Sequence, residues 1–220
     1  MKSKGPVARI YEKLYRSFGP QYWWPGDTPF EVIVGAILTQ NTAWTNVEKA
    51  IANLKRAGAL SGPAAMRKLP PRKLASLIRP AGYFNVKAGR LRNFLDHLET
   101  KYGSSLAAMS RVPTGRLREE LLGVSGIGPE TADSILLYAF NRPVFVVDAY
   151  TRRIFSRHGL LGEGATYGEI QEYFTKRFPA GRKAFNEYHA LIVRLGKELC
   201  RTRPKCAVCP LRRRSKRSCK

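Results

Sequence analysis

Apolar residues recur at helical spacing along most of the chain. Three stripes are the clearest: Phe30, Ile33, Val34, Ile37 and Leu38; Ala132, Ile135, Leu136, Ala139 and Phe140; and Tyr188, Leu191, Ile192, Leu195 and Leu199. Residues three and four positions apart lie on one face of a helix, so each stripe predicts an amphipathic helix.

Weaker patterns of the same kind predict further helices at 42–57, 71–79, 86–101, 115–122, 148–157 and 166–177. Glycines and prolines separate these segments, as expected for the turns between helices. The run 144–147 is the only strand-like one, and it has no obvious pairing partner. We interpret it as an extended loop, so the pattern predicts a compact all-α protein.

Charge is the unusual feature of the composition. The chain has 220 residues, of which 39 are Lys or Arg and 16 are Asp or Glu, giving a formal net charge of +23. Such an excess suits a polyanionic partner, with an anionic membrane surface or an extreme-environment surface as alternatives. No apolar run is long enough to span a membrane, and the N-terminus lacks the apolar core of a signal peptide. We therefore expect a cytoplasmic protein.

A glycine-rich segment, 123–128, connects two of the predicted helices. Glycine permits a close backbone approach, and successive N–H groups before a helix N-terminus form an anion site. Pro129 suits the first position of the following helix. The arrangement is typical of a helix-hairpin-helix, which holds a DNA phosphate without reading sequence. A tight turn without a ligand is the alternative.

All four cysteines lie near the end of the chain, at Cys200, Cys206, Cys209 and Cys219. Such clustering in a reducing compartment favours a metal or iron–sulfur site over disulfides. From the chemistry of four thiolates alone, a [4Fe–4S] cluster and a structural zinc are both possible.

Together these motifs resemble the helix-hairpin-helix DNA glycosylases of the endonuclease III superfamily, from about residue 30 to 209. The resemblance rests on five features in the same order: 38–42 (Leu-Thr-Gln-Asn-Thr), 82–88 (Gly-Tyr-Phe-Asn-Val-Lys-Ala), the hairpin, Val147-Asp148 and the cysteines. It implies a six-helix barrel domain at 28–140. A second helical domain, from 1–27 and 141–220, would carry the cysteine loop, with the active site in the cleft between the domains.

The resemblance implies that Asp148 is the catalytic residue. Breaking an N-glycosidic bond develops positive charge on the deoxyribose, which a carboxylate stabilises while it orients a water. The same aspartate also suits the N-cap of the helix that follows, and both roles can hold together.

Bifunctional members of the family carry a nucleophilic lysine two residues after the last hairpin glycine, where this chain has Glu130. Glutamate cannot form an imine, so the resemblance implies a monofunctional enzyme that uses water. A solvated charge at a helix N-terminus is the alternative for Glu130.

Several residues match the base pocket of the 3-methyladenine glycosylases of the endonuclease III type: Trp24, Pro25, Trp44, Glu130 and Lys197. Indole rings attract a cationic ring, and alkylation at a purine ring nitrogen makes the base cationic. The resemblance therefore implies an alkylated purine as substrate. Ordinary core packing is the alternative for the tryptophans.

The resemblance also assigns DNA contacts. Gln40, Asn41 and Tyr83 match family positions that fill the gap left by a flipped base or wedge the opposite strand. Gly126, Ile127 and Gly128 would hold a phosphate. The alternatives are a polar residue at a helix end for Gln40 and core packing for Tyr83.

The cysteine gaps are five, two and nine residues, whereas the family's iron–sulfur loop usually has six, two and five. The position of the cysteines after the last predicted helix favours a [4Fe–4S] cluster. The long gap before Cys219 leaves a zinc site, or the loss of one ligand, as alternatives. His97, His158 and His189 are too dispersed to suggest a metal site and are expected to be structural or surface residues.

We therefore expect a monomeric, nucleoid-associated N-glycosylase that acts on double-stranded DNA containing a damaged base. Two alternatives stay open. One is a bifunctional glycosylase and abasic-site lyase for oxidised pyrimidines, in which another lysine supplies the amine. The other is a non-catalytic DNA-binding module that uses the hairpin and the basic tail.

Overall fold

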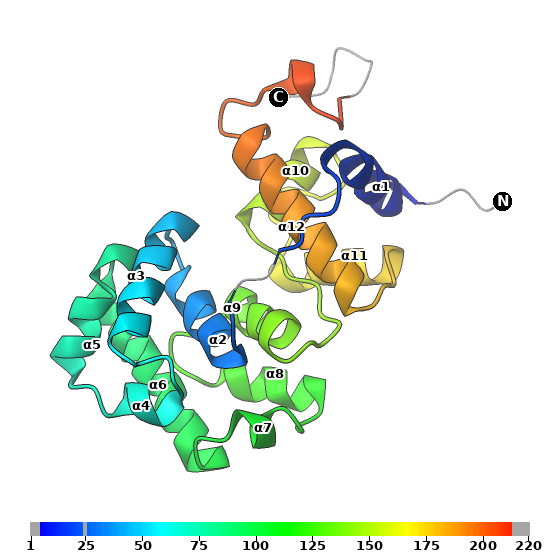
Figure 1. The fold of residues 1–220 in the computed structure, drawn as a ribbon. Coiled ribbons are helices and arrows are strands. Elements are labelled where there is room, and N and C mark those ends of the chain that lie inside the picture. Colours follow the sequence, from blue (N-terminus) through cyan, green and yellow to red (C-terminus); the bar gives the residue numbers. More distant parts are fainter. Residues whose placement is uncertain (1–4, 24–25, 213–220) are drawn as a thin grey trace. The chain divides into compact units, whose positions relative to one another are not determined.

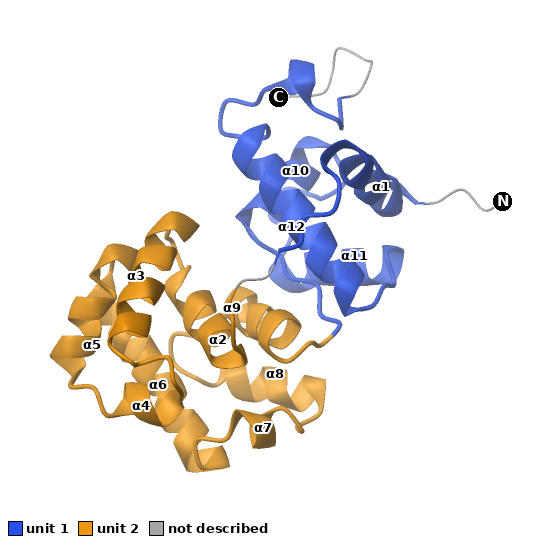
Figure 2. Cartoon of the chain, viewed as in Figure 1, with its two compact units in different colours: residues 1–23, 143–220 blue, residues 24–142 orange. Residues whose placement is uncertain are grey.

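The computed structural model describes residues 5–23 and 26–212, and within them the chain is helical without strands (Figure 1). The expected all-α class is thereby confirmed. The residues divide into two compact units, one formed by 1–23 with 143–220 and the other by 24–142, each described here by itself (Figure 2). None of the described helices is both long and apolar enough to cross a bilayer.

The 24–142 unit is built around one buried helix. Its elements are α2 (Pro29–Leu38), α3 (Trp44–Arg56), α4 (Pro63–Arg67), α5 (Pro71–Leu77), η1 (Arg79–Ala81), α6 (Phe84–Tyr102), α7 (Leu106–Met109), α8 (Thr114–Leu122), α9 (Pro129–Ser134) and the π-helical turn η2 (Ile135–Ala139). Helix α2 packs against α3, α6, α9 and η2. Apolar residues on nearly every side of α2 explain why it is central, since a helix that is hydrophobic all round is a buried one.

The other unit is organised around the last long helix. Its elements are α1 (Pro6–Phe18), α10 (Ala149–Arg157), α11 (Tyr167–Arg177), α12 (Arg182–Glu198) and the short η3 (Cys206–Val208). Helix α12 packs against α1 and α10. Its core is aromatic: the rings of Phe145 and Phe174 are stacked with centroids 4.1 Å apart, and the buried Tyr188 hydroxyl donates to the Val7 carbonyl oxygen.

Most predicted helices are present, but the second stripe is divided between α9 and the π-helical turn η2, and the short helices α4 and α7 were not predicted. The third stripe belongs to a helix that begins six residues before Tyr188, at Arg182, because Phe185 continues the buried face toward the N-terminus. Helix α1 was not predicted, although Val7 and Leu14, a full two turns apart, are both buried. The run 144–147 is extended and unpaired, as expected, and it leads directly into α10.

Candidate active site and nucleic-acid interface

Asp148 lies at the start of α10 with its carboxylate almost fully buried. The preceding Phe145–Val147 run is packed in the core, which holds the backbone extended up to the helix N-cap. Oδ1 of Asp148 accepts hydrogen bonds from the backbone N–H of Thr151 at 2.6 Å and from its hydroxyl at 2.8 Å. The N-cap geometry therefore fixes the orientation of the carboxylate and uses one of its two oxygens.

The second carboxylate oxygen faces a histidine that the sequence did not connect with it. Nε2 of His189, on α12, lies 3.4 Å from Oδ2 of Asp148, and both side chains are buried. The Trp23 ring stacks on the imidazole with centroids 5.4 Å apart and planes at 27°. His189 is thus part of this candidate site, because packing of α12 on α10 brings together residues that lie far apart in the sequence.

Two opposing effects set the pKa of Asp148. Burial raises it, since a charged carboxylate loses its hydration. The hydrogen bond and charge of His189, together with the two contacts from Thr151, outweigh burial and hold the pKa below its ordinary value. Asp148 is consequently a carboxylate at neutral pH, as a group that stabilises positive charge must be.

The hairpin between α8 and α9 presents unpaired backbone donors. The N–H of Ile127 donates to the Val124 carbonyl at 3.0 Å and closes the turn. Within the described residues, no backbone hydrogen bond uses the N–H groups of Ser125, Gly126 or Gly128. Gly126 has φ +92°, a conformation that favours glycine. With Pro129 at the first position of α9, the turn has the donors of an anion site.

Side chains from outside the hairpin hold its carbonyl groups. Asn93 Nδ2 donates to the Ser125 carbonyl at 3.0 Å, and Gln40 Nε2 donates to the Gly126 carbonyl at 2.9 Å. These two side chains hold the carbonyl groups of the turn by hydrogen bonds. The unengaged backbone N–H groups of the turn stay available for an anion.

A partly buried ion pair joins the two helices of the hairpin. Arg118 on α8 donates through Nε and Nη2 to both oxygens of Asp133 on α9, at 2.7 and 3.1 Å. Asp133 is fully buried, whereas the Arg118 side chain is 30% exposed, so the bidentate contact is partly shielded from solvent.

Gln40 is committed to the hairpin. Besides the Gly126 carbonyl, its Nε2 donates to the Thr131 hydroxyl at 2.9 Å, and its Oε1 accepts from Arg90. A role in filling the gap of a flipped base would require Gln40 to leave these partners. Its position thus indicates a support of the hairpin, which the sequence motif did not predict.

Asn41 and Tyr83 are exposed residues with unusual backbone geometry. Their φ angles are +52° and +44°, in the left-handed region that non-glycine residues seldom adopt. Tyr83 is 73% exposed even though its ring is large and apolar. Strain and exposed aromatic surface at one loop are common features of functional positions.

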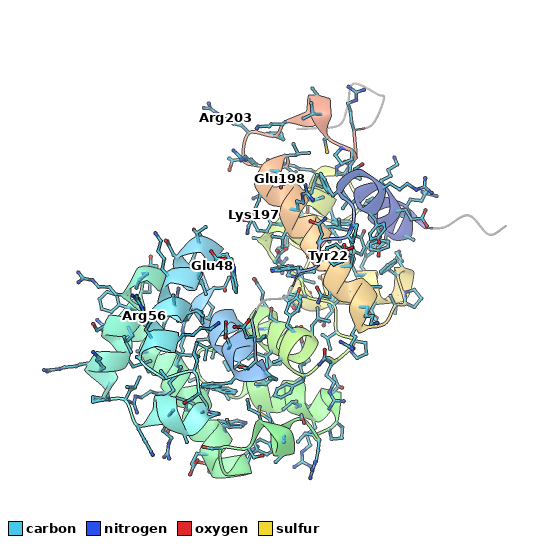
Figure 3. The ribbon with its side chains drawn as sticks, viewed as in Figure 1. Tyr22, Glu48, Arg56, Lys197, Glu198 and Arg203 are labelled. Atoms are coloured by element: carbon cyan, nitrogen blue, oxygen red, sulfur yellow. The ribbon has the colours of Figure 1, made fainter. Side chains whose placement is uncertain are left out.

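The proposed pocket residues are distributed over both units. Trp44 begins α3 and is partly exposed, Glu130 is exposed in the first turn of α9, and Lys197 is exposed on α12. Trp24 and Pro25 lie outside the described residues. Figure 3 labels Lys197 beside Glu198 on α12, and Tyr22, which is 87% exposed, on the segment after α1.

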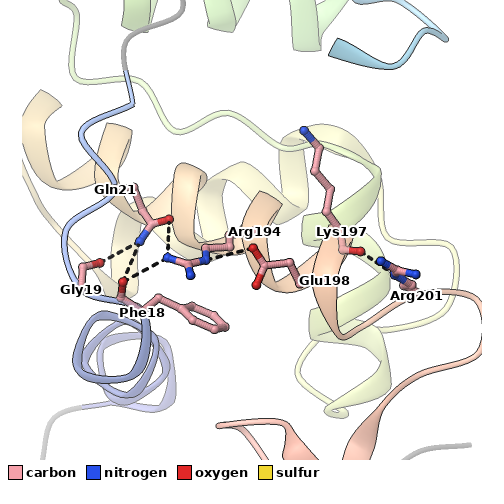
Figure 4. Close-up of polar contacts among 7 residues, drawn as sticks. All are labelled: Phe18, Gly19, Gln21, Arg194, Lys197, Glu198 and Arg201. Carbon is pink, nitrogen blue, oxygen red and sulfur yellow. Dashed lines mark hydrogen bonds and ion pairs between the residues drawn. The ribbon is translucent and has the colours of Figure 1, made fainter. Parts of the chain in front are cut away.

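The end of α12 is tied to the C-terminal end of α1. Arg194 Nη1 donates to the Phe18 carbonyl at 3.1 Å, and its Nε donates to Glu198 at 3.1 Å (Figure 4). The Lys197 backbone carbonyl accepts from Arg201 at 2.7 Å, whereas its side chain extends away from these contacts. This anchoring fixes the helix and leaves the Lys197 ammonium group exposed.

Gly196, which precedes Lys197, has a packing function. A Cβ there would lie 2.2 Å from Cδ1 of Tyr150, so α10 and α12 can approach this closely only at a residue without a side chain. The adjacent residues Gly196 and Lys197 therefore combine a close helix contact with an exposed cation.

Three of the four cysteines line one pocket after α12. Cys200, Cys206 and Cys209 contribute to its wall together with Arg157 and other residues of that loop, and Cys219 lies outside the described residues. Burial raises the pKa of the Cys209 thiol, and the nearby Cys200 adds to the rise. Within 5–23 and 26–212, no group of three or more side chains is already arranged as a metal site.

Helix α10 is bonded to this cysteine loop. Arg153 Nε donates to the Cys200 carbonyl at 2.8 Å, and Arg157 Nη1 donates to the Cys200 sulfur at 3.4 Å. The loop and the helix that carries Asp148 are therefore one packed assembly within this unit. Cys200 and Cys209 are free thiols, whereas Cys206 is disulfide-bonded. Cysteine sulfur fits the expected iron–sulfur or zinc group in type, and the pocket brings three sulfurs to one place, but ligation by Cys206 requires that its disulfide be reduced.

Comparison with known proteins identifies the family. Residues 34–180 match the model of the HhH-GPD superfamily base excision DNA repair proteins. A putative DNA repair glycosylase of Methanocaldococcus jannaschii is 48% identical over 207 residues, covering 94% of each chain. The crystal structure of H. pylori 3-methyladenine DNA glycosylase (MagIII) bound to 1,N6-ethenoadenine is similar with a TM-score of 0.79 and 30% identity, covering 87% of this chain and 97% of that one.

A third similarity concerns the fold. A trapped endonuclease III–DNA covalent intermediate has a TM-score of 0.80 at 22% identity, covering 96% of this chain and 94% of that one. The chain belongs to the HhH-GPD superfamily of base excision DNA repair proteins. It is a DNA glycosylase, an enzyme that hydrolyses N-glycosidic bonds in DNA containing a damaged base.

Proposed function

We propose that the enzyme is a monofunctional glycosylase that releases alkylated purines such as 3-methyladenine. The observation that carries this proposal is the carboxylate of Asp148, buried, fixed by Thr151 and held ionised by His189. The 30% identity to a 3-methyladenine DNA glycosylase supports the choice of substrate.

Asp148 acts on the sugar. As the bond between C1′ and the base nitrogen lengthens, its electron pair leaves with the base and positive charge develops on the deoxyribose. The carboxylate stabilises that charge electrostatically and orients the water whose oxygen then bonds to C1′. Because Thr151 occupies Oδ1, Oδ2 is the oxygen that faces the reaction, and His189 limits its rotation. The water's proton is released to the carboxylate or to solvent.

Glu130 takes the position at which the family resemblance places the nucleophilic lysine. A carboxylate cannot add to C1′ to give an imine, so no Schiff base forms there and the strand stays uncut. The negative charge of Glu130, which the N-terminal end of the α9 dipole stabilises, can itself favour a cationic base.

The nature of the leaving base supports the same substrate. An alkylated purine carries a positive charge and departs as a neutral molecule, which lowers its need for a general acid. Trp44 offers an indole face for such a ring, and Lys197 offers a donor to its polar edge. Trp24 and Pro25, outside the described residues, remain predicted stacking partners.

The decisive test is the identity of the released base. Purified enzyme is incubated with duplexes containing 3-methyladenine, 1,N6-ethenoadenine, an oxidised pyrimidine or a mismatched normal base, and free bases are separated by chromatography. We expect alkylated adenine to be released fastest. Preferential release of the oxidised pyrimidine would contradict the assigned substrate.

Replacement of Trp44 by alanine is expected to slow release of 3-methyladenine about fivefold to thirtyfold, because a stacking and cation–π interaction of about 1–2 kcal/mol is lost. Affinity for undamaged duplex should change less than about twofold. Single-turnover rates and titrations of a fluorescent duplex measure the two quantities. Equal losses in both would show that Trp44 serves packing alone.

We infer that the cysteine loop holds a [4Fe–4S] cluster, with Cys200, Cys206, Cys209 and Cys219 as ligands. Such a cluster would fix the shape of the loop. The chain's own contribution is the support from Arg153 and Arg157, which bonds the loop to α10.

Metal content separates this proposal from its alternative. Anaerobically purified protein is expected to be brown and to contain about four iron atoms per chain. Removal of the metal by a chelator should lower the melting temperature, since the ligand loop is packed on α10. A colourless protein with one zinc per chain would show that the loop holds a structural zinc and not an iron–sulfur cluster.

A further inference from the structure

Lys87 is a buried lysine without a carboxylate partner among the described residues. It lies in the first turn of α6 and is 1% exposed. Its Nζ donates three hydrogen bonds, to the Leu38 carbonyl at 2.8 Å, the Ala81 carbonyl at 2.8 Å and the Thr42 hydroxyl at 2.6 Å. All three donors of the ammonium group are thus used.

The three acceptors come from the two loops that carry the exposed, left-handed residues. Leu38 ends α2 and is followed by the loop with Asn41, whereas Ala81 ends η1 and is followed by Tyr83. The Thr42 hydroxyl also donates to the Ala81 carbonyl at 2.6 Å, which closes a triangle with the Lys87 ammonium group. One cation therefore connects the bases of both loops.

Burying the Lys87 ammonium group without a carboxylate partner among the described residues costs free energy, because the charge loses its hydration. Burial, and then the charge of Arg90, lower the pKa of Lys87 to about 8. The Leu38 carbonyl, at the negative end of α2, offsets part of the cost, because the last carbonyls of a helix lack intrahelical partners. An apolar side chain of the same length would fill this space without the desolvation penalty, so packing alone does not account for a lysine here.

We propose that Lys87 is a positioning residue that holds the Asn41 and Tyr83 loops at the fixed separation needed to open the duplex. The proposal rests on the role that the family resemblance implies for Tyr83, which is to wedge the strand opposite the damaged base. Opening a base pair costs a few kcal/mol. A loop that inserts into the duplex offsets this cost most effectively when its own conformation is already fixed. The triangle supplies this preorganisation for two strained loops at once.

The probe for the test is a duplex with a tetrahydrofuran abasic analogue opposite 2-aminopurine, whose fluorescence rises when it is unstacked. No bond is broken, so the result is independent of Asp148 and of the damaged base that the enzyme prefers. Lys87→Met removes the three hydrogen bonds at similar length. Lys73→Met removes the same charge from an exposed position on α5 and is the matched control.

Lys87→Met is expected to reduce the fluorescence rise about fivefold or more, while affinity for undamaged duplex stays within about twofold. Lys73→Met should match the wild type in both. An unchanged rise in Lys87→Met, or equal losses of rise and of affinity, would overturn the proposal. If the wild type itself gives no rise, the wedge role and the proposal both fail, whereas base release by the wild type remains an independent test of the proposed glycosylase function.

Two further variants separate positioning from general stability. In a Tyr83→Ala background, Lys87→Met should cause no additional loss, since it acts through the tyrosine loop; independent, additive losses would overturn the proposal. Thr42→Val removes one corner of the triangle and leaves two of the lysine's bonds. If Lys87→Met fails to fold, the same measurement is made on Thr42→Val. We expect Thr42→Val to reduce the fluorescence rise without lowering affinity for undamaged duplex, and a rise equal to that of the wild type would overturn the proposal.

Discussion

Asp148→Asn is expected to slow base release by about a hundredfold to ten-thousandfold, because a neutral amide cannot stabilise the developing charge on the sugar. The substitution suits this test particularly well. Asparagine is as good an N-cap as aspartate, and its Oδ1 can still accept from Thr151, so α10 keeps its start. The loss would therefore report chemistry and not folding.

Single-turnover release of the preferred base at saturating enzyme is the measurement, with melting temperature and affinity for an abasic-analogue duplex as checks. Asp96→Asn, at an exposed acid on α6, is a matched control and should retain full activity. Wild-type turnover by a folded Asp148→Asn protein would show that another group carries the reaction.

Gly126→Ala is expected to weaken DNA binding about tenfold to a hundredfold, which corresponds to about 1.4–2.8 kcal/mol. Alanine is strained at φ +92°, and its Cβ would lie 2.3 Å from Cγ of Arg90. Relief of that clash requires Arg90 to move, and Arg90 in turn holds Gln40, which holds the Gly126 carbonyl. The N–H groups of the turn would lose their alignment toward a phosphate.

Gly123→Ala is the matched control for the hairpin. Gly123 has an ordinary φ of −73°, and a Cβ there would make contacts of 3.4 Å or longer, so binding should be retained. Titration of both variants with undamaged duplex at several salt concentrations gives the affinity and the number of phosphates neutralised. Retained affinity in a folded Gly126→Ala protein would assign phosphate binding to the basic surface alone.

Local chemistry made much of the fold predictable. The stripes on α2 and α12 and the glycine turn before Pro129 are contained in short stretches of sequence, so their spacing was sufficient to find them. The N-cap of α10 was also predictable, because an acid after an extended apolar run has few other local roles. Helix α1 was missed although Val7, Leu14 and Phe18 lie at helical spacing within its 13 residues, so the local pattern would have been sufficient to find it.

Relations between distant residues were not predictable in the same way. The contact of His189 with Asp148 depends on how α12 packs against α10, and no spacing rule encodes it. Gln40 is predicted to contact DNA, and the structure adds that it holds the hairpin, since the motif shows the residue but not its partners within the protein. Lys87 was part of a recognised motif, yet only the structure reveals that its ammonium group connects two loops.

Borohydride trapping tests most directly whether Asp148 and water, and not an amine, break the bond to the base. The enzyme is incubated with a duplex containing its preferred alkylated purine, with and without borohydride, and free base, strand cleavage and protein–DNA adducts are measured together. Our account predicts that free base appears in step with abasic sites on an intact strand, with no adduct. An adduct that forms as fast as the base is released, with the strand cut at that site, would contradict it.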